Sequence, residues 1–159
     1  MKRTGEILLF NGALAPALNA FGQLAIPTGL AAGGSDALLL LGAQCEYSVA
    51  MDGASSRQAA LTRASKAAMP AITDDDVMVK MVTRQIFVTS GGIGQDSAPA
   101  FVMPPQSIVV VESNIYFQFQ TTSQTSVMSA NVNAWFERVV LTEAEKSAIL
   151  AQRLNNLLN

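Results

Sequence analysis

The sequence predicts an all-β domain, a sandwich or a barrel, that ends in one α-helix. Apolar and polar residues alternate in several segments of the 159-residue chain, as in strands with one buried face. Gly, Pro, Asn, Asp and Ser separate these segments at short intervals, which is typical of turns. Helical periodicity is convincing only near the C-terminus, so a repeated strand–helix–strand order is disfavoured. No repeat of fixed period is visible, which disfavours a propeller or a solenoid.

Residues 1–35 are expected to form an N-terminal arm and the first strands. Residues 6–10 (EILLF) read as a short strand that ends at a turn formed by Asn11 and Gly12. Residues 21–26 alternate and stop before a proline, as expected of a second strand. Small residues then predict a loop over residues 29–35.

Residues 36–140 are expected to hold the main part of the β-structure. Residues 37–49 (ALLLLGAQCEYSV) begin as a strand buried on both faces and then alternate, before a turn signal at Asp52 and Gly53. Residues 57–66 (RQAALTRASK) fit either a helix or an edge strand. Residues 77–88 alternate over twelve positions, which predicts a long strand in an antiparallel sheet.

Shorter segments complete this region. The glycine-rich residues 90–96 are expected to be a loop, followed by a short strand at residues 100–103. Residues 108–111 and 115–120, joined by ESN, form either one bulged strand or a hairpin. Residues 127–140 close the set as the last strand.

Residues 142–158 are predicted to be the C-terminal helix. Thr142 and Glu145 have the T-x-x-E spacing of a capping box, which satisfies two backbone N–H groups at a helix start. Five apolar residues lie near one stripe of this helix: Ala148, Leu150, Ala151, Leu154 and Leu158. Because an apolar stripe must pack somewhere, the helix is expected to be needed for folding or assembly.

The charge content argues against one class of partner and favours another. Only 14% of residues are charged, the net charge is −2, and the ten basic residues are scattered. Binding nucleic acid by charge neutralisation needs clustered Lys and Arg, so no specific nucleic-acid binding is expected. With few charges available, much of the surface must be neutral-polar or apolar, which favours association into an oligomer.

The sequence offers no catalytic constellation. Histidine is absent, which removes the commonest general base, the commonest metal ligand and every nucleophile–histidine pair. Cys45 is the single cysteine, so there is no internal disulfide, and its apolar surroundings predict a small core residue. Glu46, Glu112 and Glu137 are candidate carboxylates for glycoside hydrolysis, but nothing in the sequence brings two of them together. No catalytic, cofactor-binding or metal-binding residue is therefore assigned, and a non-enzyme is expected.

Two further motifs have simple interpretations. The SGGIG stretch lacks the lysine and the helix of a phosphate-binding loop, so a connecting loop is favoured. Asp74, Asp75 and Asp76 are oxygen ligands of the kind that calcium takes, yet one local cluster supplies too few of them. A solvated turn is favoured, and a calcium ion that bridges two subunits is the functional alternative.

The N-terminal residues do not predict membrane insertion. Lys2 and Arg3 precede an apolar run, and residues 15–17 (APA) resemble a cleavage site. Glu6 interrupts the start of the apolar run, and polar and turn residues end it after four positions. Neither a signal peptide nor a transmembrane segment is expected.

The aromatic residues divide between the core and the surface. Alternation places Phe117, Phe119 and Phe136 on inward faces. Tyr116 and Trp135 lie on the opposite faces of their strands, and Asn131 and Asn133 share the face of Trp135. Tyr116 and Trp135 are predicted to be subunit-interface residues, because both carry a polar atom and both types are enriched at interfaces. An aromatic platform for sugars or bases is the other interpretation of the aromatic residues.

The order of these features resembles one protein family. ALLLLGAQCEYSV is followed by a long alternating strand, Pro104 and Pro105, IVVVESNIYFQFQ, a polar loop and VNAWFERVVLTEAEKSAIL. Over residues 37–150 this order resembles the single-jelly-roll capsid proteins of icosahedral viruses, in particular tailless double-stranded DNA viruses. The resemblance implies an eight-stranded antiparallel jelly-roll sandwich, many copies in a shell, no enzymatic activity, and loops and termini that lock neighbouring subunits.

The leading hypothesis is therefore a capsid subunit that self-assembles through polar, low-charge interfaces into an icosahedral shell. Its expected location is the virion, and its expected partners are copies of itself and other virion proteins. The chain lacks the basic N-terminal arm of small RNA-virus coats, so a contact with an internal membrane or another inner layer fits better than genome packaging. Two alternatives stay open. One is a decoration, tail or spike protein of a virion, and the other is a non-catalytic carbohydrate- or ligand-binding β-sandwich module.

Overall fold

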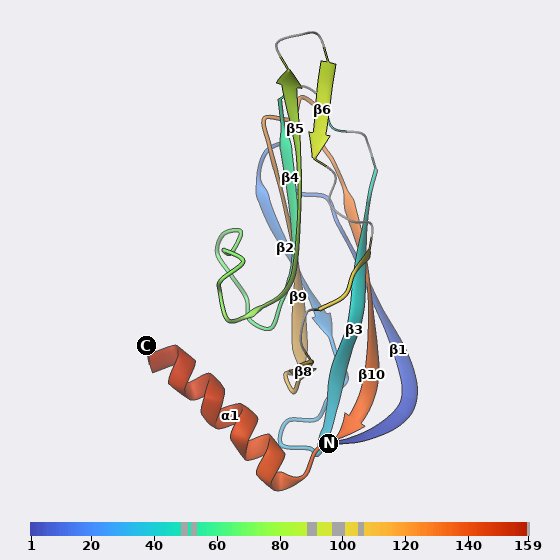
Figure 1. Ribbon diagram of the computed structural model, residues 1–159, viewed down its shortest axis with the longest axis vertical. Coiled ribbons are helices and arrows are strands. Elements are labelled where there is room, and N and C mark those ends of the chain that lie inside the picture. Colours follow the sequence, from blue (N-terminus) through green and yellow to red (C-terminus); the bar gives the residue numbers. More distant parts are fainter. Residues whose placement is uncertain (49–50, 52–53, 89–91, 97–100, 105–106, 159) are drawn as a thin grey trace.

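The chain forms two antiparallel β-sheets packed face to face, with a single α-helix at the C-terminal end (Figure 1). The computed structural model describes residues 1–48, 51, 54–88, 92–96, 101–104 and 107–158. The all-β prediction with a C-terminal helix is confirmed as a β-sandwich.

The first sheet has the strand order β1–β10–β3, with β7 and β8 both paired to the free edge of β3. The bounds of its strands are β1 Lys2–Leu14, β10 Ala130–Val140, β3 Asp36–Tyr47, β7 Phe101–Val102 and β8 Ile108–Val110. Because β7 and β8 pair with different parts of β3, this sheet is four strands wide.

The second sheet has the strand order β2–β9–β4–β5–β6. The bounds of its strands are β2 Phe21–Pro27, β9 Asn114–Thr122, β4 Ser56–Thr62, β5 Val77–Val88 and β6 Gly92–Asp96. The described part of the chain thus holds ten strands, where eight were expected: β7 and β8 are separate short strands that both pair with β3, and β6 forms where a loop was expected.

The hydrophobic core fills the space between the two sheets. Phe117 and Phe119 of β9 and Phe136 of β10 are fully buried, as their alternation predicted. Leu38 of β3 and Leu61 of β4 fill the same layer. A large aromatic side chain that is fully removed from water contributes about 2–3 kcal/mol of transfer free energy, so these residues account for much of the packing energy.

The prediction of a turn at Asn11 and Gly12 is wrong, because both residues lie inside β1. Asn11 pairs with Asn133, and Gly12 pairs with Val132. A Cβ atom on Gly12 would come within 2.9 Å of the Ile26 Cδ1 atom of the facing sheet. The glycine therefore permits close approach of the two sheets and does not mark a reversal of the chain.

Residues 57–66 are neither a helix nor an edge strand. Residues 56–62 form β4, which hydrogen-bonds to β9 on one side and to β5 on the other. Pairing on both edges outweighs the helical preference of the alanines, because tertiary contacts override weak local propensity.

Two other expectations about connections are wrong. Residues 92–96 are strand β6 paired to the end of β5, although glycine-rich sequence predicted a loop. The ESN segment joins neither a hairpin nor one bulged strand, since β8 pairs with β3 in the first sheet and β9 lies in the second. The chain crosses between the sheets there, and local sequence does not encode which partner each strand finds. The predicted turn at Asp52 and Gly53 lies outside the described residues.

The predicted C-terminal helix is confirmed as α1, Glu143–Leu158. The Thr142 backbone N–H donates to Glu145 Oε2 at 2.8 Å, and the Glu145 backbone N–H donates to Thr142 Oγ1 at 3.3 Å. This is the reciprocal capping box that the sequence predicted.

The central aromatic layer gives a direct test of the fold. Replacing Phe117 with Ala is expected to lower the free energy of unfolding by about 3–5 kcal/mol, because it leaves a cavity between the sheets. Chemical denaturation followed by circular dichroism measures this value. Val127→Ala is the control, since Val127 is 56% exposed and its truncation should change stability by less than about 0.5 kcal/mol. Equal effects of the two substitutions would contradict the position of Phe117 in the core.

Candidate functional site

The two predicted interface residues lie on opposite sides of the molecule. Trp135 is on the outer face of the first sheet, directly opposite Leu9 of β1 and Gly42 of β3. Tyr116 is on the outer face of the second sheet, opposite Ala25. Both side chains are partly buried within the chain itself. One flat contact with a neighbour cannot contain both residues, so each outer face must be considered separately.

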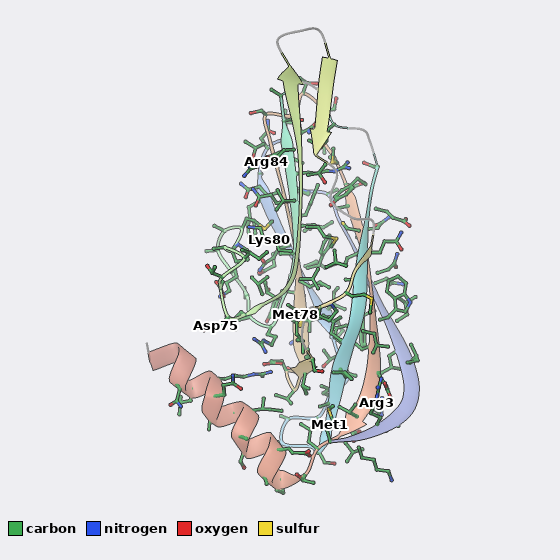
Figure 2. The ribbon with its side chains drawn as sticks, viewed as in Figure 1. Met1, Arg3, Asp75, Met78, Lys80 and Arg84 are labelled. Atoms are coloured by element: carbon green, nitrogen blue, oxygen red, sulfur yellow. The ribbon has the colours of Figure 1, made fainter. Side chains whose placement is uncertain are left out.

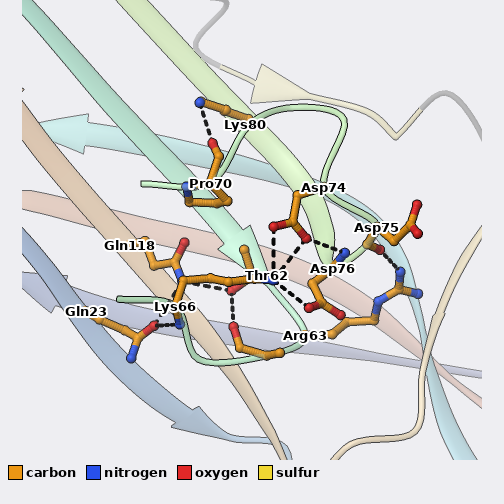
Figure 3. A network of polar contacts seen from close by, with 11 residues as sticks. Gln23, Thr62, Arg63, Lys66, Pro70, Asp74, Asp75, Asp76, Lys80 and Gln118 are labelled. Carbon is orange, nitrogen blue, oxygen red and sulfur yellow. Dashed lines mark hydrogen bonds and ion pairs between the residues drawn. The ribbon is translucent and has the colours of Figure 1, made fainter. Parts of the chain in front are cut away.

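The outer face of the second sheet is covered by the β4–β5 connection, residues 63–76 (Figure 3). Gln118 is fully buried there, and its Nε2 donates to Gln23 Oε1 at 2.9 Å and to Thr62 Oγ1 at 3.1 Å. The Lys66 backbone N–H also donates to Gln23 Oε1, at 2.8 Å. Lys80 Nζ donates to the backbone carbonyl of Pro70 at 2.6 Å. These bonds fix the connection on the sheet and leave little of this face for a ligand.

The three consecutive aspartates belong to this covering segment. Lys66 Nζ lies 3.0 Å from Asp74 Oδ2 and 2.7 Å from Asp76 Oδ2, so its ammonium sits between the two carboxylates (Figure 3). The guanidinium of Arg63 donates to the backbone carbonyl of Asp75. Burial opposes ionisation of Asp74 and of Lys66, but their mutual hydrogen bonds outweigh it, so the pKa of Asp74 falls and that of Lys66 rises.

This arrangement favours a structural role for the acidic segment over calcium binding. The positive charge that a cation would supply comes from Lys66. Within the ranges that the structure describes, no group of three or more His, Cys, Asp or Glu could hold a metal ion.

The three candidate glutamates have different surroundings and different partners. Glu137 is buried on the outer face of the first sheet, where Arg3 Nε donates to it at 2.7 Å and the Gly5 backbone N–H at 3.2 Å. Glu112 is paired with Arg153, and Glu46 accepts from Gln44 Nε2 at 3.4 Å. No two of these carboxylates share a partner among the described contacts.

The bond from Arg3 holds the pKa of Glu137 below its usual range. Figure 2 shows Met1 and Arg3 at the end of the sandwich from which α1 starts. The ion pair therefore fixes the beginning of β1 beside β10, where Gly5 at φ +76° and a register shift interrupt the pairing.

Cys45 is a core residue, as predicted. It lies in the main hydrophobic cluster, and burial raises the pKa of its thiol to about 11. Its neighbour Tyr47 carries the guanidinium of Arg57 over its ring, 3.8 Å from the ring centroid. A thiol that stays protonated at neutral pH is a poor nucleophile.

The outer face of the first sheet, by contrast, is rich in side-chain amides and is exposed at Asn11, Asn131 and Glu46, while Asn133 and Trp135 are partly buried. Three rows of side chains cross β1, β10 and β3: Leu9, Trp135 and Gly42; Asn11, Asn133 and Gln44; Ala13, Asn131 and Glu46. A shallow cavity of about 290 Å³ lies over the second and third of these rows and is lined by residues of β1 and β10 and by Glu46 of β3. The side-chain amides of Asn11, Asn131 and Asn133 make no hydrogen bond within the described part of the chain. We call Asn11, Asn131, Asn133, Gln44 and Glu46 the amide face.

Sequence analysis missed the amide face for one reason. Asn11 was interpreted as a turn residue, so β1 stopped before it reached the amides of β10. Continued alternation through residue 14 would have placed Asn11 on the same face as Leu9, which was the available signal.

Helix α1 presents a second surface with exposed side chains. Figure 1 shows it leaving the end of the sandwich beside the N-terminus. Of its described side chains, only Glu145, Lys146, Ile149 and Arg153 are partly buried. Ile149 packs against a small cluster on the outer face of the first sheet, formed by Ala37, Leu39, Val139 and Leu141.

Polar contacts, and not the apolar stripe of the helix, hold α1 in place. The N-terminal amine of Met1 pairs with Glu145, Lys146 Nζ donates to the carbonyl of Gly33, and Arg153 binds Glu112. Leu150 is 48% exposed and Leu154 is 58% exposed. The described residues of the predicted stripe, Ala148, Leu150, Ala151 and Leu154, are therefore exposed instead of packed against the sandwich.

No helix among the described residues is long and apolar enough to cross a membrane. No protein-family model matches the chain, and no curated protein matches its sequence.

The Arg3–Glu137 pair predicts a pH-dependent contribution to stability. Because the pKa of Glu137 is lowered in the folded chain, the pair stabilises the fold above the ordinary carboxyl pKa of 4.5 and loses its effect as the pH falls through the lowered value. The Tm of Arg3→Gln is expected to lie below that of the wild type at pH 7, and the difference should shrink as the pH falls below 4.5. Thermal melts between pH 7 and pH 2 measure it, and a difference that stays constant with pH would contradict the ion pair.

The Lys66 network gives a separate prediction. Lys66→Met is expected to lower the free energy of unfolding by about 1 kcal/mol, the range of partly exposed ion pairs, because Asp74 and Asp76 then face each other unneutralised. Millimolar calcium chloride should leave the Tm of the wild type unchanged. Lys2→Met is the control, since it removes the same charge from an exposed position. A calcium-dependent rise of the wild-type Tm would overturn the structural interpretation of the aspartates.

Proposed function

We propose that the chain is a structural protein of a viral particle, a capsid subunit with a jelly-roll fold that assembles through surfaces of low charge. The strand pairing supports the jelly-roll assignment. If β7 and β8 are counted as one strand position and the edge strand β6 is left out, the chain has eight strand positions. The first pairs with the eighth (β1 with β10), the second with the seventh (β2 with β9), the third with the sixth (β3 with β7 and β8) and the fourth with the fifth (β4 with β5). A long hairpin wound into two sheets has this nesting, which is that of a jelly roll.

The observation that carries the proposal is the exposed stripe of α1. An isolated helix of sixteen residues is marginally stable in water, and a helix normally gains its stability by burying an apolar face. Here Leu150 and Leu154 are exposed, while hydrogen bonds and ion pairs keep the helix in position. A neighbouring copy that covers this stripe supplies the burial that the single chain lacks.

A second unpaired surface favours assembly between copies. Strand β1 is an edge strand, and residues 7–14 contain no charged side chain. Ile7 and Leu9 on its outer face are each 54% exposed. An uncharged edge normally invites association, and proteins that stay monomeric protect such edges. Because the stripe of α1 and the edge of β1 are different surfaces, a contact of one with the other would be heterologous and would repeat from copy to copy, in a ring or an open array, rather than close on itself as a dimer.

The remaining parts of the proposal follow from charge and from the absence of paired catalytic groups. Other virion proteins are the expected partners beside further copies, with an internal membrane or inner layer beneath the shell. The net charge of −2 argues against binding the genome by charge neutralisation, and we expect no enzymatic activity. A decoration protein would share the unpartnered helix but would form small oligomers and no closed shell.

The oligomeric state of the full chain tests this function. Size-exclusion chromatography with light scattering, followed by negative-stain microscopy, is expected to give capsomers or shells. The double substitution of Leu150→Asp and Leu154→Asp is expected to yield monomers with an unchanged circular dichroism spectrum, because both residues are exposed in the single chain. Deleting residues 142–159 should impair assembly in the same way.

Gln152→Glu is the matched control, because it adds one negative charge to an exposed position of α1 on a different side from the two leucines. It should assemble as the wild type does. A wild-type chain that stays monomeric at high concentration, or leucine variants that still assemble, would contradict the proposal.

A further inference from the structure

The amide face on the first sheet is a group of hydrogen-bonding side chains that the fold itself does not use. Asn11 of β1 and Asn133 of β10 are directly opposed, and so are Asn133 and Gln44 of β3. Directly opposed residues have Cβ atoms about 5 Å apart, and successive rows on one face are about 6.6 Å apart. Asn11, Asn131 and Asn133 therefore lie within the span of one small ring-shaped molecule, with Trp135 one row away.

We propose that the amide face and Trp135 form a binding site for a carbohydrate, with a sugar ring against the indole and its hydroxyl groups bonded to the amides. The site does not depend on the capsid proposal, since a single chain contains all of it. It lies on the opposite side of the sandwich from the covered face of Gln118.

The chemistry of the side chains selects a polyhydroxylated ligand. A carboxamide offers a donor and an acceptor side by side, and a hydroxyl group is also both donor and acceptor. The amides of Asn11, Asn131 and Asn133 have their full capacity left, because no described residue bonds to them. A Glu46 carboxylate without an ion-pair partner among the described residues adds an acceptor for a further hydroxyl.

The same residues disfavour other ligands. The lining of the cavity contains no Lys or Arg, so nothing neutralises a phosphate or a carboxylate. A volume of about 290 Å³ suits one ring and is shallow for a larger apolar molecule. Trp135 is partly buried and lies one row from the lining of the cavity, where the exposed part of its indole supplies the apolar surface that the less polar face of a sugar requires.

Trp135 also allows sugar binding to be measured by fluorescence, because it is the single tryptophan of the chain. Fluorescence titrations of the full-length protein use glucose, galactose, mannose and N-acetylglucosamine as separate probes, with ethylene glycol as the probe without a ring. At least one sugar is expected to give a saturable change in emission with a millimolar Kd, and ethylene glycol is expected to give none. Asn133→Ala, which removes the central amide, should weaken that binding by about tenfold or more, the effect of losing a hydrogen bond of about 1.4 kcal/mol.

Gln120→Ala is the matched control, since it removes an amide from the outer face of the second sheet, opposite Phe21. It should bind the sugar as the wild type does, and near-ultraviolet circular dichroism checks that both variants are folded. The proposal is overturned if none of the four sugars gives a saturable change, or if Asn133→Ala binds as tightly as the wild type. It is also overturned if Asn133→Ala changes the oligomeric state and no sugar binds, because the amide face is then a contact between copies. The Leu150 and Leu154 variants should retain sugar binding, so failure of the capsid proposal and failure of this one are distinguishable.

Discussion

The packing of two sheets through a layer of phenylalanines is the interaction on which the other features of the molecule depend. Phe117 and Phe119 reach inward from β9, and Phe136 reaches inward from β10, and all three are fully buried. β9 pairs with β2 and β10 pairs with β1, so the core joins segments far apart in sequence. Gly12 lets the sheets approach closely at one point, and the rest of the layer is filled by aliphatic side chains. Once the inner faces are joined, alternation along each strand assigns every other residue to an outer face.

The two outer faces differ in how much of each is covered by the chain itself. The connection after β4 crosses the second sheet, and it is held there by the buried amide of Gln118 and by the ion pairs of Lys66. The first sheet is partly covered by Ile149 at one end, and at the other end Asn11, Asn131 and Glu46 of the amide face are exposed. A polar face that is sealed by its own chain stabilises the fold, whereas a polar face that stays open can bind another molecule.

Sequence reasoning predicted the features that depend on local patterns. The long strand of residues 77–88 and the helix with its capping box are confirmed, because each is encoded by periodicity or spacing within one segment. The expectations that were wrong concern residues 11–12, 57–66, 92–96 and 112–114. Each of them depends on a partner strand distant in sequence, and glycine and alanine are ambiguous until that partner is known. The apolar stripe of α1 was predicted correctly. Its exposure could not be predicted, because the sequence of a helix does not encode which segment lies beside it.

The β class, the lack of histidine, the low charge and the position of the capped helix can be read from the amino acids alone, because they are properties of composition and of short-range pattern. Long-range pairing, in contrast, makes β4 a central strand, brings Lys66 between Asp74 and Asp76, and aligns Asn11 with Asn133 and Gln44 in one row. Trp135 illustrates both sides. Its amphipathic side chain indicated a surface position, but which face it shares, and with which amides, follows from a register between three strands that meet only when the sheets close over their core.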